Sequence, residues 1–456
     1  MKTKQTPFKV YLTEEELPKF WYNITADMPN PLLPYLNPQT LEPASAADMQ
    51  AIFPDSIIEQ EMSRERYIEI PEPVREIYKQ YRPSPLYRAH FLEKLLDTPA
   101  RLYFKYEGAN PSGSHKMNTA IAQAFYNHEA GIHKMTTETG AGQWGTALCA
   151  AGAMFDIDVT VYMVKVSAMQ KPYRKLLMET YGGHVFASPS DTTQAGRAAL
   201  EENPDNLGSL GLAISEAVEV AASHADTNYG LGSVLNHVAL HQTVIGQEAI
   251  KQFEYMDDYP DVVIACNGGG SNFCGIALPF IGKQLKEGGN TKFIAVEPTA
   301  CPKLTKGKFA YDYADVAKMT PVTPMYTLGS DFEPAGIHAG GLRYHGDSPI
   351  LSQLYKDGYV EARAVSQNTV FKAAIDFAKT QMILPAPESA HAIAQAIQEA
   401  LVCKETGESK AILFNVSGHG NFDLTAYENY LSGNLIDYEY EEESIQKSME
   451  KLPKVK

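Results

Sequence analysis

The chain has little cysteine, no long hydrophobic run and a deficit of basic residues, and each shortage excludes a class of protein. Its five cysteines are scattered and without the close pairs of a metal knuckle, which is typical of a reduced, cytoplasmic protein. No apolar run is long enough to span a membrane, and the first ten residues lack the apolar core of a secretory signal. With 39 basic and 55 acidic residues, the net charge of −16 argues against nucleic acid and anionic membranes as partners.

Extended apolar stretches alternate with helical patterns from about residue 100 onward. A chain of 456 residues is too long for one compact core, and 44% hydrophobic residues suffice for two or three domains. The predicted strands cover 101–106, 136–138, 159–164, 261–266, 292–297 and 410–416. The predicted helices cover 146–154, 243–252, 371–379 and 389–402. This alternation predicts an α/β fold with largely parallel sheets.

Changes in composition divide the chain into four segments. Residues 1–90 are rich in proline, which interrupts helices, and we expect a wrapping extension with short helical pieces. Residues 91–240 and 241–435 are expected to form an N-terminal and a C-terminal α/β domain. Residues 436–456 are a charged tail, for which we expect a solvated helix or a frayed terminus.

A lysine stands where a turn-rich loop meets a helical pattern, in the sequence Ser114-His115-Lys116-Met117-Asn118. At a helix N-terminus the dipole disfavours the charged ammonium form, and only a neutral amine attacks an aldehyde. Lys116 is therefore a candidate for Schiff-base chemistry, although a solvated surface charge is the commoner role of a lysine.

A run of three glycines, Gly268, Gly269 and Gly270, follows the predicted strand 261–266 and precedes a helical stretch. Glycines let the backbone approach a ligand closely, and amide groups between a strand and a helix form a nest for phosphate. The pattern is neither that of a nucleoside-triphosphate loop nor the dinucleotide fingerprint. It predicts a site for one phosphate group, with a simple tight turn as the alternative.

Two further loops follow predicted strands. Glu138 opens a loop over 139–145. The amide groups of this loop suit a carboxylate, and the glutamate suits proton transfer. A helix-capping turn with an exposed glutamate is the alternative. Ser417 follows the strand 410–416, and its hydroxyl either reaches the ligand or caps the next helix. Because ligands of open α/β sheets bind at the carboxyl ends of strands, we expect all four loops to share one site.

A lysine beside a nest for one phosphate, without a nucleotide motif or a metal cluster, describes a pyridoxal-phosphate site. Lys116 would hold the cofactor, residues 268–272 its phosphate, and Ser417 its pyridine nitrogen. A neutral hydroxyl at that nitrogen would leave it unprotonated, which favours loss of a β-substituent from a bound amino acid.

These motifs resemble those of the tryptophan synthase beta chain family, fold-type-II pyridoxal-phosphate enzymes, over about residues 80–430. The matching stretches are 113–118, 138–143, 268–272, 384–392 and 417–420. The long N-terminal section is similar to the second, longer class of this family. The resemblance implies two three-layer α/β domains with the cofactor in the cleft between them.

The resemblance also implies a role for each matching residue. The implied catalytic residues are Lys116 and Glu138, the latter as acid and base for the serine hydroxyl and the indole nitrogen. The implied cofactor-binding residues are His115, Lys116, Asn118, Gly268, Gly269, Gly270, Ser271, Asn272, Glu388 and Ser417. The implied substrate-binding residues are Thr139, Gly140, Ala141, Gly142, Gln143, Trp144 and Arg343. Residues 166–178 correspond to the mobile region that closes over the site.

The implied reaction is β-replacement: L-serine loses water to give an aminoacrylate, which indole attacks to form L-tryptophan. The implied cofactor is pyridoxal phosphate, and a monovalent cation is common in the family, although no motif here identifies its ligands. We expect a homodimer with weak or transient contact to an alpha chain.

Two residues depart from the common form of the family. Trp144 stands where that form has histidine, and Arg343 stands where it has an aspartate associated with the serine hydroxyl. An arginine is a fixed cation, so it suits an anionic donor such as O-phospho-L-serine as well as L-serine itself.

Two alternatives belong to other classes of protein. A serine or threonine deaminase would share the lysine and the phosphate nest, but such enzymes generally carry Ser- and Asn-rich loops where this chain has 138–143. A cofactor-binding scaffold without activity would need none of Lys116, Glu138 and Ser417.

Overall fold

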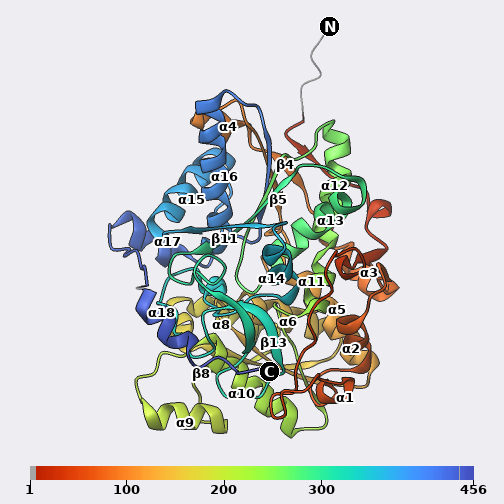
Figure 1. The fold of residues 1–456 in the computed structure, drawn as a ribbon, viewed down its shortest axis with the longest axis vertical. Helices are drawn as coiled ribbons and strands as arrows, with labels where there is room; N and C mark the ends of the chain where they lie inside the picture. Colours follow the sequence, from red (N-terminus) through yellow and green to blue (C-terminus); the bar gives the residue numbers. More distant parts are fainter. Residues whose placement is uncertain (1–6, 441, 456) are drawn as a thin grey trace.

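The computed structural model describes residues 7–440 and 442–455, and its largest sheet has seven strands (Figure 1). The strands lie in the order β1-β4-β5-β15-β10-β11-β14. They are β1 (Lys9–Val10), β4 (Leu86–Arg88), β5 (Arg101–Tyr106), β10 (Val262–Cys266), β11 (Lys292–Pro298), β14 (Glu361–Val365) and β15 (Ala411–Val416). The pairs from β5 to β14 are parallel, and the edge pairs β1–β4 and β4–β5 are antiparallel.

Strand β10 illustrates why helices cover both faces of this sheet. Its residues are all buried, and successive side chains of a strand point to opposite faces. Val263 and Ala265 pack in one core cluster with the neighbouring helices on their face, whereas Val262 and Ile264 pack in another. Figure 1 shows α15 and α16 on one side of the sheet and α12 and α13 on the other. These helices are α12 (Val244–Met256), α13 (Ser271–Glu287), α15 (Gln367–Gln381) and α16 (Pro387–Thr406).

A second, fully parallel sheet has four strands in the order β8-β7-β6-β9. Its strands are β6 (Lys134–Thr139), β7 (Asp158–Val164), β8 (His184–Ser188) and β9 (Thr227–Tyr229). Val161 faces α6, and Tyr162 faces α10, so this sheet also has a helical layer on each face. The helices of this part are α5 (Met117–Glu129), α6 (Gln143–Met154), α7 (Lys165–Gln170), α8 (Pro172–Thr180), α9 (Gln194–Glu202) and α10 (Leu210–Ser223).

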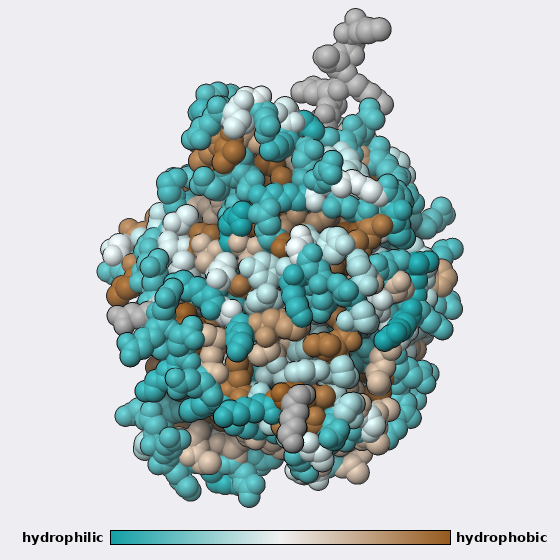
Figure 2. All heavy atoms as spheres, in the orientation of Figure 1, coloured by the Kyte–Doolittle hydropathy of each residue, from teal (hydrophilic) through white to brown (hydrophobic). Residues whose placement is uncertain are grey.

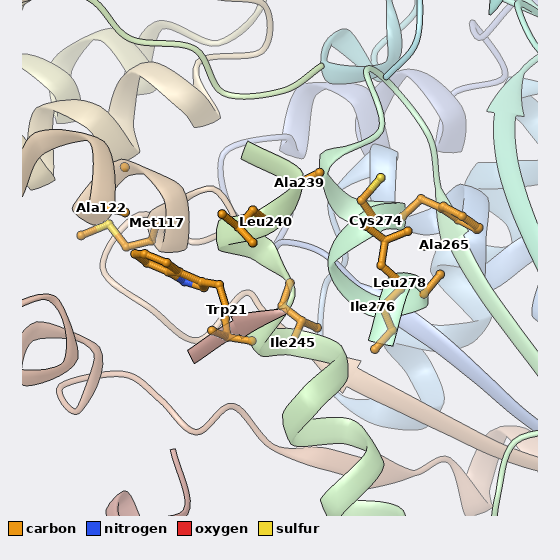
Figure 3. Close-up of a cluster of buried hydrophobic side chains, with 14 of the residues drawn as sticks. Trp21, Met117, Ala122, Ala239, Leu240, Ile245, Ala265, Cys274, Ile276 and Leu278 are labelled. Atoms are coloured by element: carbon orange, nitrogen blue, oxygen red, sulfur yellow. The ribbon is translucent and has the colours of Figure 1, made fainter. Parts of the chain in front are cut away.

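The proline-rich N-terminal segment wraps around both parts in short pieces. They are the strands β2 (Phe20–Tyr22) and β3 (Tyr67–Glu69) and the helices α1 (Ala46–Met49), α2 (Asp55–Met62) and α3 (Glu72–Tyr78). Trp21 of β2 is completely buried beside Met117 and Leu240 (Figure 3). This anchor ties the segment to the core next to the helix that follows Lys116.

The remaining elements connect or cover the two sheets. They are α4 (His90–Leu96), α11 (Asn236–Gln242), the hairpin β12 (Lys308–Tyr313) and β13 (Val322–Thr327), α14 (Pro349–Lys356), α17 (Leu424–Leu431) and α18 (Glu442–Met449). The charged tail is not merely solvated, because Ile445 of α18 is buried against Cys301, Leu328 and Phe332.

The predicted α/β fold with largely parallel sheets is confirmed, and each predicted strand and helix has a counterpart in the structure. Strand β5, which the predicted boundaries place with residues 91–240, pairs instead with β15 in the larger sheet. None of the helices in the described part of the chain combines the length and apolar character needed to cross a membrane. Figure 2 shows a face covered mostly by hydrophilic residues, with hydrophobic residues in small groups between them.

Candidate functional site

An apolar cavity lies where the carboxyl ends of β6 and β9 meet the glycine loop after β10. Its polar wall holds Lys116 and Glu138 with Thr139, Gly140, Ala141 and Gln143. Its apolar wall is formed by Tyr35, Met49, Ile52, Phe53, Trp144, Leu210, Ile214, Tyr229, Leu231, Val234 and Tyr344. Gly269 and Gly341 line the side that comes from the larger sheet, so both sheets contribute to one site.

Lys116 immediately precedes α5 and points its side chain into this cavity. Its Nζ donates a hydrogen bond to the carbonyl oxygen of Gly232 at 2.8 Å. Burial lowers the pKa of Lys116 to about 8, and the nearby carboxylates of Glu138 and Glu388 oppose that shift. A lysine with this pKa holds a substantial neutral fraction near neutral pH, as attack on an aldehyde requires.

Glu138 near the end of β6 faces the same cavity and is only 5% exposed. Burial raises its pKa to about 7, although the Tyr229 hydroxyl, which donates a hydrogen bond to its carboxylate, acts in the opposite direction. A carboxyl group with this pKa can give up and accept a proton near neutral pH. The predicted alternative of an exposed glutamate is therefore wrong.

The glycine loop 268–270 is shaped for a close approach. Gly270 has φ +101°, in the left-handed region, and a Cβ on Gly268 would overlap the carbonyl oxygen of Gly341. Among the described residues, none of the three glycine amides donates a hydrogen bond to another protein group. Because α13 begins directly after them, these amides and the helix dipole favour an anion.

His115 approaches the same loop. Its Nε2 lies 3.0 Å from Ser271 Oγ. Burial, with the neighbouring charge of Lys116, lowers the pKa of His115 to about 3, so the imidazole is neutral. Its Nδ1 is buried and lacks a hydrogen-bond partner among the described residues.

Ser417 and Glu388 lie beyond the lysine on the carboxyl side of the larger sheet. Ser417 Oγ lies 2.8 Å from Ser389 Oγ, in a buried pair of hydroxyls. Glu388 Oε1 accepts a hydrogen bond from the Gly341 amide at 2.9 Å, while its buried Oε2 has no partner in the described part of the chain. Buried polar atoms are normally paired, so the unpartnered Oε2 of Glu388 fits a polar ring bound between the lysine, the glycine loop and the serine.

The loop after Glu138 and the tryptophan that follows it form one wall of the site. Gly142 has φ +90°, which lets the chain turn into α6. Trp144 Nε1 donates to Thr137 Oγ1 at 2.6 Å, and its ring packs so closely on Gly232 that no side chain would fit there. Trp144 therefore contributes shape to the cavity rather than a polar group.

Three predicted site residues point elsewhere. The side chain of Asn118 accepts from Arg82 and donates to Gln242, both at 2.9 Å, beneath α5. The Asn272 side chain bonds to Asn415 and to the Cys266 carbonyl, which leaves only its backbone toward the loop.

Arg343 is the third, and its position differs most from the sequence-based expectation. Its guanidinium donates to the Pro334 carbonyl at 3.0 Å and lies near Cys301 and Tyr440, outside the cavity lining. Gly341 and Tyr344 line the cavity on either side of Arg343, so it is the arginine side chain, and not the backbone, that points away from the site.

Other lining residues were not predicted from the sequence. Tyr229 ends β9 and Ser233 follows it. This three-residue strand is too short to stand out, although a strand followed by glycines occurs there as it does before the other site loops. Met49, Ile52 and Phe53 come from the N-terminal segment, where the apolar spacing of a short helix was the available signal.

The predicted closure region 166–178 is docked against the C-terminal part of the chain. Lys171 Nζ pairs with Asp423 Oδ1 at 2.5 Å and donates to the His338 carbonyl at 3.2 Å. Arg174 is fully buried and lies 4.8 Å from the ring centre of Phe422. These contacts hold α7 and α8 beside the loop that follows Glu138, where Gly142 packs against Arg174.

Comparison with known proteins gives independent evidence on the family of this chain. A family model described as pyridoxal-phosphate dependent enzyme matches residues 77–418. The chain is 57% identical to tryptophan synthase beta chain 2 of Methanosarcina acetivorans over 428 residues, which cover 94% of this chain and 97% of the relative. It is 58% identical to tryptophan synthase beta chain 2 of Thermotoga maritima, over 92% of this chain and 99% of the relative.

Two solved structures share the fold at low sequence identity. Threonine deaminase isoform 2 from Solanum lycopersicum has a TM-score of 0.58 at 19% identity and covers 78% of this chain and 89% of its own. An L-serine ammonia-lyase from Rhizomucor miehei has a TM-score of 0.57 at 19% identity, over 78% of this chain and 99% of its own.

Proposed function

The chain belongs to the tryptophan synthase beta chain family of pyridoxal-phosphate-dependent enzymes, and from this premise we propose how its residues join L-serine to indole. The activity itself, pyridoxal-phosphate-dependent formation of tryptophan, follows from relatives 57% and 58% identical over nearly the whole chain. The observation that carries the site assignment is the meeting of Lys116, Glu138 and Gly269 at one cavity.

The cofactor site is assigned to the polar groups around Lys116 and the glycine loop, several of which have no partner among the described residues. Pyridoxal phosphate supplies an aldehyde that condenses with amines and a ring that withdraws electrons from a bound amino acid. Lys116 would hold its aldehyde carbon, and the amides of 268–272 with the neutral His115 would hold its phosphate. Ser417 would present a neutral hydroxyl to the ring nitrogen, and Glu388 would lie near the ring.

Proton transfer is assigned to Lys116 and Glu138, two groups that line the cavity and whose pKa values burial moves toward neutrality. Lys116, with a pKa of about 8, takes the α-proton of serine. Glu138, with a pKa of about 7, gives a proton to the departing serine hydroxyl and later takes one from the indole nitrogen. The amides of Thr139 to Gln143 hold the substrate carboxylate in place.

The apolar wall selects the second substrate. Indole is flat and apolar, and the wall from Trp144, Phe53, Ile52 and Tyr344 offers it burial without unpaired polar groups. The same wall keeps water away from the reacting β-carbon. Indole addition should therefore be faster than hydrolysis of the dehydrated serine to pyruvate and ammonia.

The donor and product can be tested together. We expect purified protein with pyridoxal phosphate, L-serine and indole to accumulate L-tryptophan, measured by chromatography. The Arg343 guanidinium donates a hydrogen bond to the Pro334 carbonyl outside the cavity, so it is not placed to bind the phosphate of O-phospho-L-serine. We therefore also expect kcat/KM for L-serine to exceed that for O-phospho-L-serine. Pyruvate and ammonia as the main products in the presence of indole would identify a deaminase instead.

The assembly and location are proposed on more general grounds. The relatives are beta chains by name, so we propose a homodimer that meets an alpha chain weakly or transiently. The five cysteines are buried and unpaired, which suits the reducing cytoplasm. Light scattering with and without an alpha chain measures both association states.

Replacement of Tyr229 by phenylalanine should move the pH profile of the enzyme. The Tyr229 hydroxyl stabilises the ionised form of Glu138, so its removal raises the Glu138 pKa above about 7. The inflection of kcat/KM near pH 7 should therefore move to higher pH by about one unit. Tyr344→Phe is the matched control, because Tyr344 also lines the cavity but donates to the Ala314 carbonyl. Equal profiles for both variants would exclude Glu138 as the titrating group.

A further inference from the structure

A buried lysine lies directly behind the proposed phosphate loop. Lys303 stands in the turn that follows β11, and its side chain is completely buried. Its Nζ donates to the carbonyl oxygen of Asn267 at 3.2 Å and lies 3.9 Å from a carboxylate oxygen of Glu297 and of Asp347. One cation therefore faces three oxygen groups from three segments of the chain.

The partners of this lysine are attached to the loop itself. Asn267 is the residue before Gly268, and its side-chain amide donates to Asp347 Oδ2 at 2.5 Å. A Cβ placed on Gly270 would lie 2.7 Å from Ser348 Cβ and 3.3 Å from Asp347 Oδ1. Residues 347–348 thus pack against the Gly270 end of the glycine loop, and Asn267 fixes the Gly268 end of the loop.

The charges in this cluster need compensation. Burial raises the pKa of Glu297 and raises that of Asp347 to about 7. Glu297 accepts from the backbone amides of Leu304 and Thr305, which holds the lysine turn. Among the described residues, Lys303 is the cation paired with either carboxylate, and a buried charge without its partner is strongly unfavourable.

We propose that Lys303 is a positioning residue for the cofactor: its ammonium is a built-in cation that holds the Asn267 carbonyl and fixes the phosphate loop. No dissolved monovalent cation is then needed at this place. The proposal rests on the proposed role of residues 268–272 in binding the phosphate of pyridoxal phosphate. In the described part of the chain Lys303 donates no hydrogen bond to these glycines, and it acts through Asn267 and Asp347.

Two variants separate the charge of Lys303 from its volume. Lys303→Met keeps most of the volume and removes the charge. Lys303→Ala also leaves a hole bordered by one carbonyl and two carboxylates, the oxygen ligands that hard cations prefer. Lys306→Met is the matched control, because Lys306 is exposed in the same turn.

The experiment titrates each apoprotein with pyridoxal phosphate by visible absorbance, in a buffer whose only cation is tetramethylammonium. It is repeated with potassium or ammonium chloride at equal ionic strength. We expect wild type and Lys306→Met to bind equally with every salt. Lys303→Met should lose affinity about tenfold or more with every salt. Lys303→Ala should lose as much and recover most of it with ammonium or potassium.

Each outcome decides the proposal. Wild-type affinity that rises with potassium or ammonium overturns it, and this measurement does not depend on any variant folding. Lys303→Met that matches Lys306→Met in affinity overturns it as well. Failure of the wild type to bind pyridoxal phosphate with any salt would instead reject the proposed function.

Discussion

Replacement of Lys116 by alanine should lower tryptophan formation from L-serine and indole by at least about 10⁴-fold, because two roles depend on one amine. Lys116 is the candidate for holding the cofactor and for taking the α-proton, and burial lowers its pKa to about 8. Alanine removes the Nζ that reaches Gly232 but leaves the glycine loop intact, so pyridoxal phosphate should still bind, more weakly and removable by dialysis.

Three measurements distinguish this outcome from general damage. Tryptophan is quantified by chromatography, bound cofactor by visible absorbance, and the attached lysine by borohydride trapping followed by peptide mass mapping. Lys134→Ala is the control, since Lys134 is exposed at the start of β6 and pairs with Asp226. Cofactor trapped on another lysine, or activity within threefold of wild type, would refute the assignment of Lys116.

The parts of the site that follow strands could be predicted from the sequence. Lys116, Glu138 and the glycines 268–270 each stand at a change of pattern from strand or turn to helix, and the carboxyl ends of parallel strands converge. The raised pKa of Glu138 depends on its burial beside Tyr229, and no local pattern reveals which distant side chain will cover a carboxylate.

Side-chain direction was harder to predict than position along the chain. Arg343 follows Gly341, which does line the cavity, yet its guanidinium turns away to Pro334. Asn118 is two residues after Lys116. Because each residue of a helix is rotated by about 100° from the one before, Asn118 points to the opposite side, toward Arg82. A motif match therefore predicts which residue type stands at a position, but it does not predict the direction in which the side chain points.

The apolar wall from the N-terminal segment depends on contacts distant in sequence. Phe53 reaches a cavity whose lysine lies more than sixty residues later in the chain. Proline-rich segments give weak periodicity, so their fold is set by what they cover, as the burial of Trp21 against Leu240 illustrates.

Replacement of Glu138 by glutamine should lower kcat by about 10²- to 10⁴-fold while the affinity for pyridoxal phosphate stays within a few-fold of wild type. Glutamine keeps the size of the side chain and can still accept from Tyr229, so the cavity should keep its shape. It cannot exchange a proton near pH 7, which a carboxyl group with a pKa of about 7 can do. Glu129→Gln, at the exposed end of α5, is the matched control.

Measuring the two halves of the reaction separately tests whether Glu138 serves both. Loss of the serine hydroxyl is measured without indole, as slow release of pyruvate, and addition of indole is measured as tryptophan. If Glu138 both protonates the departing hydroxyl and takes the indole proton, Glu138→Gln should slow both by more than tenfold. If tryptophan formation fell while pyruvate release did not, the hydroxyl would leave with a proton from another group. Lys116 is then a candidate, because its charge interacts with that of Glu138 in the same cavity. Unchanged rates in both assays would show that Glu138 takes no part in the mechanism and that its role at the cavity wall is structural.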